Sequence, residues 1–252
     1  MRDKTADDRF FILTLFGIAM EAERQALCKE DTILQVSLPV GLPPKHYGAL
    51  YQKFQEYFSG RDRQSFTYRG KAYTIEIEQV SAFPQDYAVA MTIYPKISEF
   101  NKVVTVDIGG FTLDYLLIRS GKPDLSACDS LEKGVITLYN KVISRINSEH
   151  DILLEDSDVD RIIREEKTDY GTQIQKTVRE MTRTYVDDLL GTLRERGIDL
   201  KTGCVVFIGG GALLLREYLS HSEKIGHCVF IEDIRVNAKG YGLLYQIQRK
   251  GR

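Results

Sequence analysis

Several features that mark other classes of protein are missing from this sequence of 252 residues. It has no signal peptide and no apolar run of about 18 residues, so we expect no export and no membrane span. The histidines are not spaced with serine and aspartate as in a hydrolase triad, and the Gly-x-x-x-x-Gly-Lys-Ser/Thr phosphate loop does not occur. These absences argue against a triad hydrolase and against a Walker-type nucleotide-binding protein.

Cysteine is also scarce, and its spacing predicts neither a disulfide framework nor a metal site. The four cysteines are far apart in the sequence, and two of them lie in predicted buried strands: Cys28, Cys128, Cys204 and Cys228. Cysteines of this kind are typical of reduced packing residues. We therefore expect a cytoplasmic protein.

The charges nearly cancel, which limits the partners that composition alone suggests. The formal net charge is −2, with 43% hydrophobic and 28% charged residues. This composition predicts a soluble globular protein with one or two ordinary cores. It gives no overall electrostatic reason for direct binding to nucleic acid or membrane, although a local basic patch stays possible.

Residues 103–118 predict a buried strand, a glycine turn and a second strand. Val103, Val104 and Val106 favour a strand covered on both faces, and Gly109-Gly110 favours a two-residue hairpin with positive φ. Glycines allow backbone amides to approach an anion, and Asp107 could hold a hydrated cation beside it. The stretch suits a metal-nucleotide phosphate, with an ordinary hairpin as the alternative.

A second glycine signal follows about a hundred residues later in the sequence. Residues 204–208 predict a buried strand, Gly209-Gly210-Gly211 a turn, and residues 212–219 a helix. Glycines at the carboxyl end of a strand leave room for a flat or anionic ligand group. Close packing of helix on strand would explain them equally well.

Together these stretches resemble two motifs of the actin-like ATPases. The segment Asp107-Ile108-Gly109-Gly110-Phe111-Thr112-Leu113-Asp114 is similar to their second phosphate motif, and Ile208-Gly209-Gly210-Gly211-Ala212 to their adenosine motif. The form Asp-x-Gly-Gly-x-Thr-x-Asp resembles that of bacterial plasmid-segregation proteins of the ParM/StbA kind. Residues 80–88 and 237–244 resemble the two connecting segments of the family.

The resemblance implies a fold, ligands and roles for individual residues. The fold is an α/β, actin-like (ribonuclease H-like) ATPase fold, with two α/β domains around a nucleotide cleft. Mg-ATP would bind there, Asp107 would contact the hydrated Mg²⁺ or the attacking water, and Gln85 would position that water. The other implied ligand-binding residues are Gly109, Gly110, Phe111 and Thr112 for phosphate, and Arg164, Glu165, Gly209, Gly210, Gly211 and Ala212 for adenosine.

The resemblance also implies a domain organisation. Residues 1–100 would form a partial first domain, residues 101–236 the second domain, and residues 237–252 a helix returning to the first. Relatives open with a phosphate hairpin containing Asp-x-Gly, and nothing before Asp107 matches it. We therefore expect a first domain truncated at its amino terminus.

Three functions remain open at this point. The first is a filament-forming ATPase that segregates plasmid or mobile-element DNA, self-associating and contacting DNA through an adaptor protein. The second is a truncated, non-hydrolysing scaffold or filament-binding protein, since ATP hydrolysis would require the missing hairpin. The third is a small-molecule kinase of the same superfamily.

The remaining hydrophobic pattern predicts helices that flank these strands. An amino-terminal helix with Phe11, Ile12 and Leu15 facing the core should open the chain, and a helix from Ser130 should contain Gly134. A glycine inside a helix costs about 1 kcal/mol relative to alanine. A close approach by a strand or ligand would explain it.

Overall fold

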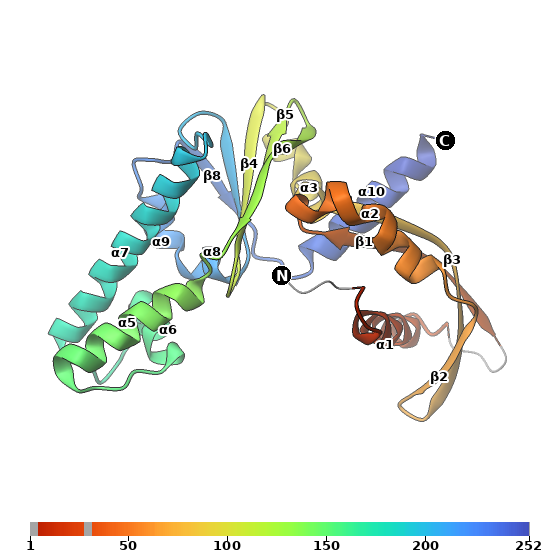
Figure 1. The fold of residues 1–252 in the computed structure, drawn as a ribbon, viewed down its shortest axis with the longest axis horizontal. Helices are drawn as coiled ribbons and strands as arrows, with labels where there is room; N and C mark the ends of the chain where they lie inside the picture. The colour runs from red at the N-terminus through yellow and green to blue at the C-terminus, as the bar shows by residue number, and fades with distance from the viewer. Residues whose placement is uncertain (1–4, 28–31, 252) are drawn as a thin grey trace. The chain divides into compact units, whose positions relative to one another are not determined.

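The computed structural model describes residues 5–27 and 32–251, so Cys28 and the residues around Met1 lie outside the described part. Two compact units can be distinguished. The first comprises the residues up to Leu42, His46–Pro84 and the residues from Tyr241 on, and the second comprises Pro43–Lys45 and Gln85–Gly240. Each has its own sheet and helices (Figure 1). None of the helices in the described ranges is both long and apolar enough to span a bilayer.

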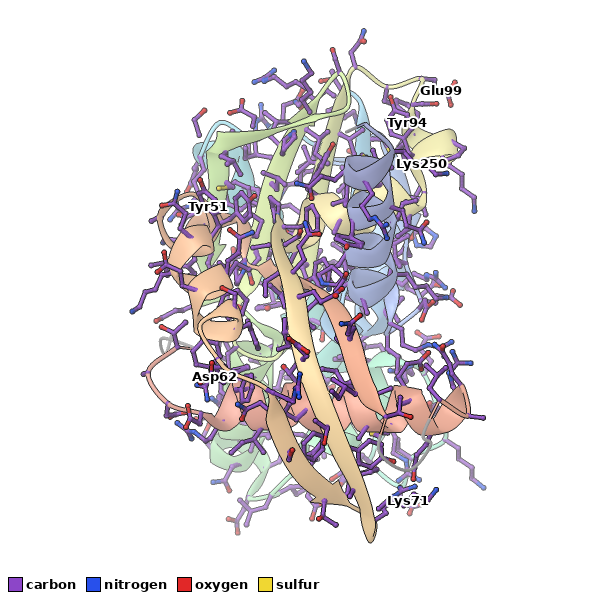
Figure 2. All side chains as sticks on the ribbon, turned by 90° about the vertical axis from the view of Figure 1, so that its right-hand side faces the viewer. Tyr51, Asp62, Lys71, Tyr94, Glu99 and Lys250 are labelled. Carbon is purple, nitrogen blue, oxygen red and sulfur yellow. The ribbon has the colours of Figure 1, made fainter. Side chains whose placement is uncertain are left out.

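The first unit is built on a three-stranded sheet in the order β1-β3-β2. Its elements are β1 (Ile33–Leu42), β2 (Gln64–Tyr68), β3 (Lys71–Pro84), α1 (Arg9–Arg24), most of α2 (Pro44–Ser59) and the later part of α10 (Val236–Lys250). A hairpin joins β2 to β3, and Figure 2 shows β3 as a long strand with Lys71 at its start. Aromatic residues of α2 and apolar residues of α1 pack around Ile75 of β3 and form the core of this unit.

The second unit contains a five-stranded sheet in the order β6-β5-β4-β7-β8. Its strands are β4 (Lys102–Ile108), β5 (Leu113–Arg119), β6 (Lys122–Leu131), β7 (Cys204–Ile208) and β8 (His227–Phe230). Its helices are α3 (Gln85–Thr92), α4 (Tyr94–Ile97), α5 (Val135–His150), α6 (Asp156–Ile163), α7 (Thr172–Glu195), α8 (Gly210–Leu214), α9 (Arg216–Ser220) and the start of α10. Strand β4 pairs antiparallel with β5 and parallel with β7. Its valines are buried on both faces of the sheet, as is typical of a central strand.

Helices cover both faces of this second sheet. Successive residues of a strand point to opposite faces. Val104 and Val106 therefore pack with α5 and α7 on one face, whereas Val103 packs with α3 and α4 on the other. The three layers bury most of the central strands β4, β5 and β7, and the carboxyl ends of β4 and β7 lie side by side.

The compact units do not follow the expected division at residue 100. Helices α3 and α4 pack on the sheet that follows them in sequence and belong to the second unit. The last helix, α10, starts in the second unit, and its residues from Tyr241 onward belong to the first.

Three local predictions were wrong. The helix expected from Ser130 begins at Val135, because Ser130 and Leu131 continue the pairing of β6 with β5 and Gly134 is the residue that caps the helix. The single helix expected over residues 212–219 consists of two short helices, α8 and α9. On α1, Phe11 and Leu15 are buried as expected, but Ile12 is 46% exposed.

Candidate functional site

Both glycine turns lie at the carboxyl ends of neighbouring parallel strands. Asp107 of β4 pairs in register with Ile208 of β7, so the residues that follow each strand emerge at the same edge of the sheet. A Cβ atom added to Gly209 would lie 2.4 Å from Asp107 Oδ1. The φ of Gly209 is +89°, which other residues rarely adopt. Both facts require glycine where the second turn passes the carboxylate of the first.

The first turn has a different geometry from the predicted two-residue hairpin. Four residues, 109–112, separate β4 from β5, and the amide of Gly109 donates to the carbonyl of Thr112 at 2.9 Å. Neither Gly109 nor Gly110 has positive φ. The prediction of a strand, a glycine turn and a strand was therefore confirmed, but its conformational reason was wrong.

Helix α5 holds the carbonyl side of this turn. The amide of Gly134 donates to the carbonyl of Phe111 at 3.0 Å. The amide of Val135 donates to the carbonyl of Gly109 at 3.1 Å, and that of Ile136 to the carbonyl of Gly110 at 3.0 Å. Within the described chain, the amides of Gly110, Phe111 and Thr112 donate to no carbonyl. Free amides grouped in a turn form a concave anion-binding surface.

Gly134 allows the close contact between α5 and the turn. A Cβ at this position would lie 2.2 Å from the carbonyl oxygen of Gly110 and 2.5 Å from the amide nitrogen of Phe111. Its φ of −80° is open to any residue, so the requirement is one of space. The sequence predicted a close approach at Gly134, and the structure shows that the approaching backbone is the first glycine turn.

Gly211 has a similar packing role in the second turn. A Cβ there would come within 2.8 Å of Ile108 and 2.7 Å of Val135. Gly210 has nothing within 4 Å of an added Cβ, so it lies beside open space. Ala212 is fully buried.

Three carboxyl groups gather beside the first turn. Asp107 and Asp114 are direct partners in the β4–β5 pair, and Asp86 lies in the first turn of α3, which packs on both strands. Thr112 Oγ1 donates to Asp114 Oδ2 at 2.9 Å. Asp86 is 1% exposed. We call Asp86, Asp107 and Asp114 the acidic triad.

The environment of the triad disfavours its negative charge. Burial, and then the charge of Asp114, raises the pKa of Asp107 to about 6. Burial, followed by the charges of Asp107 and Asp114, raises the pKa of Asp86 well above its ordinary value. No ion pair involves these three carboxylates within the described residues.

Two buried oxygen atoms of the triad have no hydrogen-bond partner, Asp86 Oδ2 and Asp114 Oδ1. Orphaned carboxylate oxygens are what a divalent cation with oxygen ligands would satisfy. No three acidic, histidine or cysteine side chains of the described residues are placed to ligate one ion directly. The triad therefore fits Mg²⁺ held through part of its water shell.

Arg164 and Glu165 lie at a cavity of about 910 Å³ between α6, α7 and α9. Leu213 and Leu214, which follow the glycine triplet, line the same cavity. Glu165 Oε1 lies 3.9 Å from Arg179 Nε. Arg164 and Glu165 therefore share a cavity with the helix that follows the second turn. None of the described glycines lines this cavity.

Gln85 is the first residue of α3, and its neighbour Asp86 belongs to the triad. Sequence reasoning missed Asp86 as a site residue and used Asp114 only as part of a motif. A signal for Asp86 was available, because an acidic residue precedes the apolar segment Ala88-Val89-Ala90.

Two family models match the sequence, and no curated protein does. The model described as the C-terminal domain of the archaeal actin homologue MreB-like proteins matches residues 105–221. The model described as the N-terminal domain of actin-like proteins matches residues 1–87. Both models describe actin-like proteins, and each match covers less than half of the chain.

Solved structures of actin-like proteins share its fold. The psk41 ParM protein without ligand is 16% identical with a TM-score of 0.72, and the match covers 98% of this chain and 73% of that one. ParM from Bacillus thuringiensis with ATP is 13% identical with a TM-score of 0.65, covering 99% and 77%. A ParM filament from Clostridium botulinum is 19% identical with a TM-score of 0.66, covering 98% and 76%. The chain therefore has the actin-like fold, as expected.

Proposed function

We propose that this actin-like chain binds Mg-ATP through the two glycine turns of its second unit. The observation that carries the proposal is the close contact between the two turns. Gly209 of the second turn can lie beside Asp107 Oδ1 only because glycine has no Cβ atom. The free amides of the first turn and the unpaired oxygens of the acidic triad supply the two kinds of group that a metal-phosphate needs. The similar ParM protein of Bacillus thuringiensis was solved with ATP.

Each site residue then has the role that the resemblance to actin-like proteins implies. The amides of Gly110, Phe111 and Thr112 bind phosphate oxygens, with the turn held by α5. Asp107 would hold the hydrated cation, and Gln85 would orient the attacking water. Bound Mg²⁺ would neutralise phosphate charge, which together with positioning accounts for most catalysis of phosphoryl transfer.

The adenosine side of the site uses the second turn. Gly209 and Gly210 line the adenosine, with the buried Gly211 and Ala212 packed behind them, and the open space beside Gly210 suits a flat ring. Arg164 and Glu165 contact the ribose and base from the cavity edge. A cavity of about 910 Å³ has the size of a small-molecule site.

We further propose that nucleotide hydrolysis controls self-association into filaments that segregate plasmid or mobile-element DNA in the cytoplasm. The similarity to a ParM filament supports the assembly. The net charge of −2 favours an adaptor protein over direct contact with DNA.

Calorimetric titration of the whole chain with Mg-ATP tests the proposal, with Asp107→Ala as the site variant. We expect binding by the parent chain and a loss of roughly tenfold or more in the variant, since charge-assisted contacts contribute about 1.5–3 kcal/mol. Equal affinity in both proteins would refute the site. Asp188→Asn, on the exposed side of α7, is the control for removing an acid elsewhere in the same unit.

Phosphate release and light scattering then separate the functional alternatives. ATP-dependent scattering with phosphate release supports the filament-forming ATPase. Nucleotide binding without phosphate release would identify the non-hydrolysing scaffold. Phosphate transfer to an added sugar or acid would instead identify a kinase.

A further inference from the structure

Asp86 is a deeply buried acidic side chain of the second unit, and the proposed function assigns it no role. It is 1% exposed, and its Oδ2 accepts no hydrogen bond. An acid in the first turn of a helix often satisfies the helix's own amides. Asp86 Oδ2 does not do this, so capping of α3 does not explain why an acid is buried here.

The strand pattern directs Asp107 and Asp114 toward the face that α3 covers. Val103 on β4 and Leu116 and Ile118 on β5 belong to the cluster that packs under α3. Residues two apart on a strand share a face, so Asp107 lies on the face of Val103 and Asp114 on the face of Leu116. Asp86, in the first turn of α3, lies over that same face.

Among the described residues, no basic side chain forms an ion pair with the triad. Asp107 and Asp114 are direct partners in the β4–β5 pair, and Asp86 lies over the same face of the sheet. A buried carboxylate without a partner is very unfavourable, and three near one another are more so. A cation of charge +2 that keeps part of its water shell could reach all three without direct ligation.

We propose that Asp86 is the third carboxylate of the hydrated-cation site and that it increases the affinity of this site for a divalent cation. The inference rests on the proposed function, since it places the cation of that site. It also ties the cation to α3, the helix that carries Gln85.

Divalent cation binding without nucleotide tests this assignment. Mn²⁺ replaces Mg²⁺ as the probe, and electron paramagnetic resonance measures free Mn²⁺ in solutions of the whole chain. We expect Asp86→Asn, which keeps the shape of the side chain, to weaken Mn²⁺ binding roughly fivefold or more by removing one nearby charge. Asp188→Asn removes an equal charge from the exposed side of α7 and should bind Mn²⁺ like the parent chain.

Thermal unfolding provides a second readout that does not depend on activity. Without divalent cations, Asp86→Asn should melt at a higher temperature than the parent chain because a buried, unpaired acid is gone. Added Mg²⁺ should raise the melting temperature of the parent chain more than that of the variant. A variant that fails to fold would contradict the expected rise and would itself count against the assignment.

The outcomes distinguish this inference from the proposed function. Equal Mn²⁺ affinity in Asp86→Asn and the parent chain overturns the role of Asp86, as does a parent chain that binds no Mn²⁺. Neither result affects the Mg-ATP titration. Conversely, a parent chain that binds Mn²⁺ through Asp86 but does not bind ATP would leave this site standing and refute the nucleotide proposal.

Discussion

Helices α1 and α7 show how differently the two units cover their apolar residues. On α7, the inward residues Leu189, Leu190 and Leu193 are at most 2% exposed. On α1, Leu13 is 63% exposed and Met20 is 55% exposed, although the opposite side of the helix packs in the core. A helical hydrophobic pattern therefore identifies which residues are apolar, but only the surrounding layers decide how many of them are buried.

The largest effect that would test this contrast comes from shortening one leucine on each helix. Leu189→Ala should lower the free energy of unfolding of the second unit by about 2–5 kcal/mol, because it leaves a cavity in a closed core. Leu13→Ala should change the stability of the first unit by no more than about 0.5 kcal/mol. Urea unfolding followed by hydrogen exchange, which reports on each unit separately, measures both. Similar losses in the two variants would mean that the α1 surface is covered in solution.

A second pair of variants compares two glycines within the second unit. Gly134→Ala should destabilise it by about 1–3 kcal/mol, since the new methyl group would overlap the turn backbone. Gly191→Ala, in α7 with nothing within 4 Å, should stabilise it by up to about 1 kcal/mol. Urea unfolding gives the two signs, and a neutral Gly134→Ala would show that the turn can move away from α5.

The acidic triad predicts that the second unit responds to pH in the absence of divalent cations. The pKa of Asp107 is about 6 in the folded chain, above its ordinary value, so the folded state binds this proton more tightly than the unfolded state. Stability should therefore increase as pH falls through about 6. A single such group contributes about 1.4 kcal/mol between about pH 7 and pH 5.

Chemical unfolding in EDTA at the two pH values measures this gain. Asp107→Asn should remove its own contribution, while Asp188→Asn should keep the full pH dependence. A second unit that loses stability on acidification in this range would contradict the raised pKa.

The smallest predicted effect lies in the first unit. Tyr57 on α2 accepts a hydrogen bond from the amide of Phe11 at 2.9 Å and donates one to the carbonyl of Asp7 at 2.8 Å. Tyr57→Phe should cost about 1 kcal/mol, because a net hydrogen bond contributes about that much. Hydrogen exchange at the Phe11 amide should accelerate in the variant, and unchanged exchange there would mean that Tyr57 does not fasten the start of α1.

Much of the second unit could be predicted from the sequence because its signals are local. Valine-rich strands and glycine turns indicated β4, β5 and β7. The turn at residues 109–112 was placed correctly for a wrong reason. Its glycines do not have positive φ, and the tight packing against the turn occurs at Gly134, more than twenty residues later in the sequence.

The acidic triad could be predicted only in part. Asp107 stood out at the end of an apolar strand, but the contribution of Asp86 depends on α3 lying over β4 and β5, which is a tertiary contact. The start of α5 was misplaced for a similar reason. Pairing of β6 with β5 at Ser130 and Leu131 overrides the helical preference of that segment.

The contact between α5 and the turn also provides a way to observe the turn directly. The amide protons of Val135 and Ile136 are bonded to the carbonyls of Gly109 and Gly110, so they can exchange with solvent only when the two segments separate. In a spectrum of the protein, these two signals would therefore report how long the turn stays closed. A ligand that fixes the turn should slow their exchange without contacting either residue.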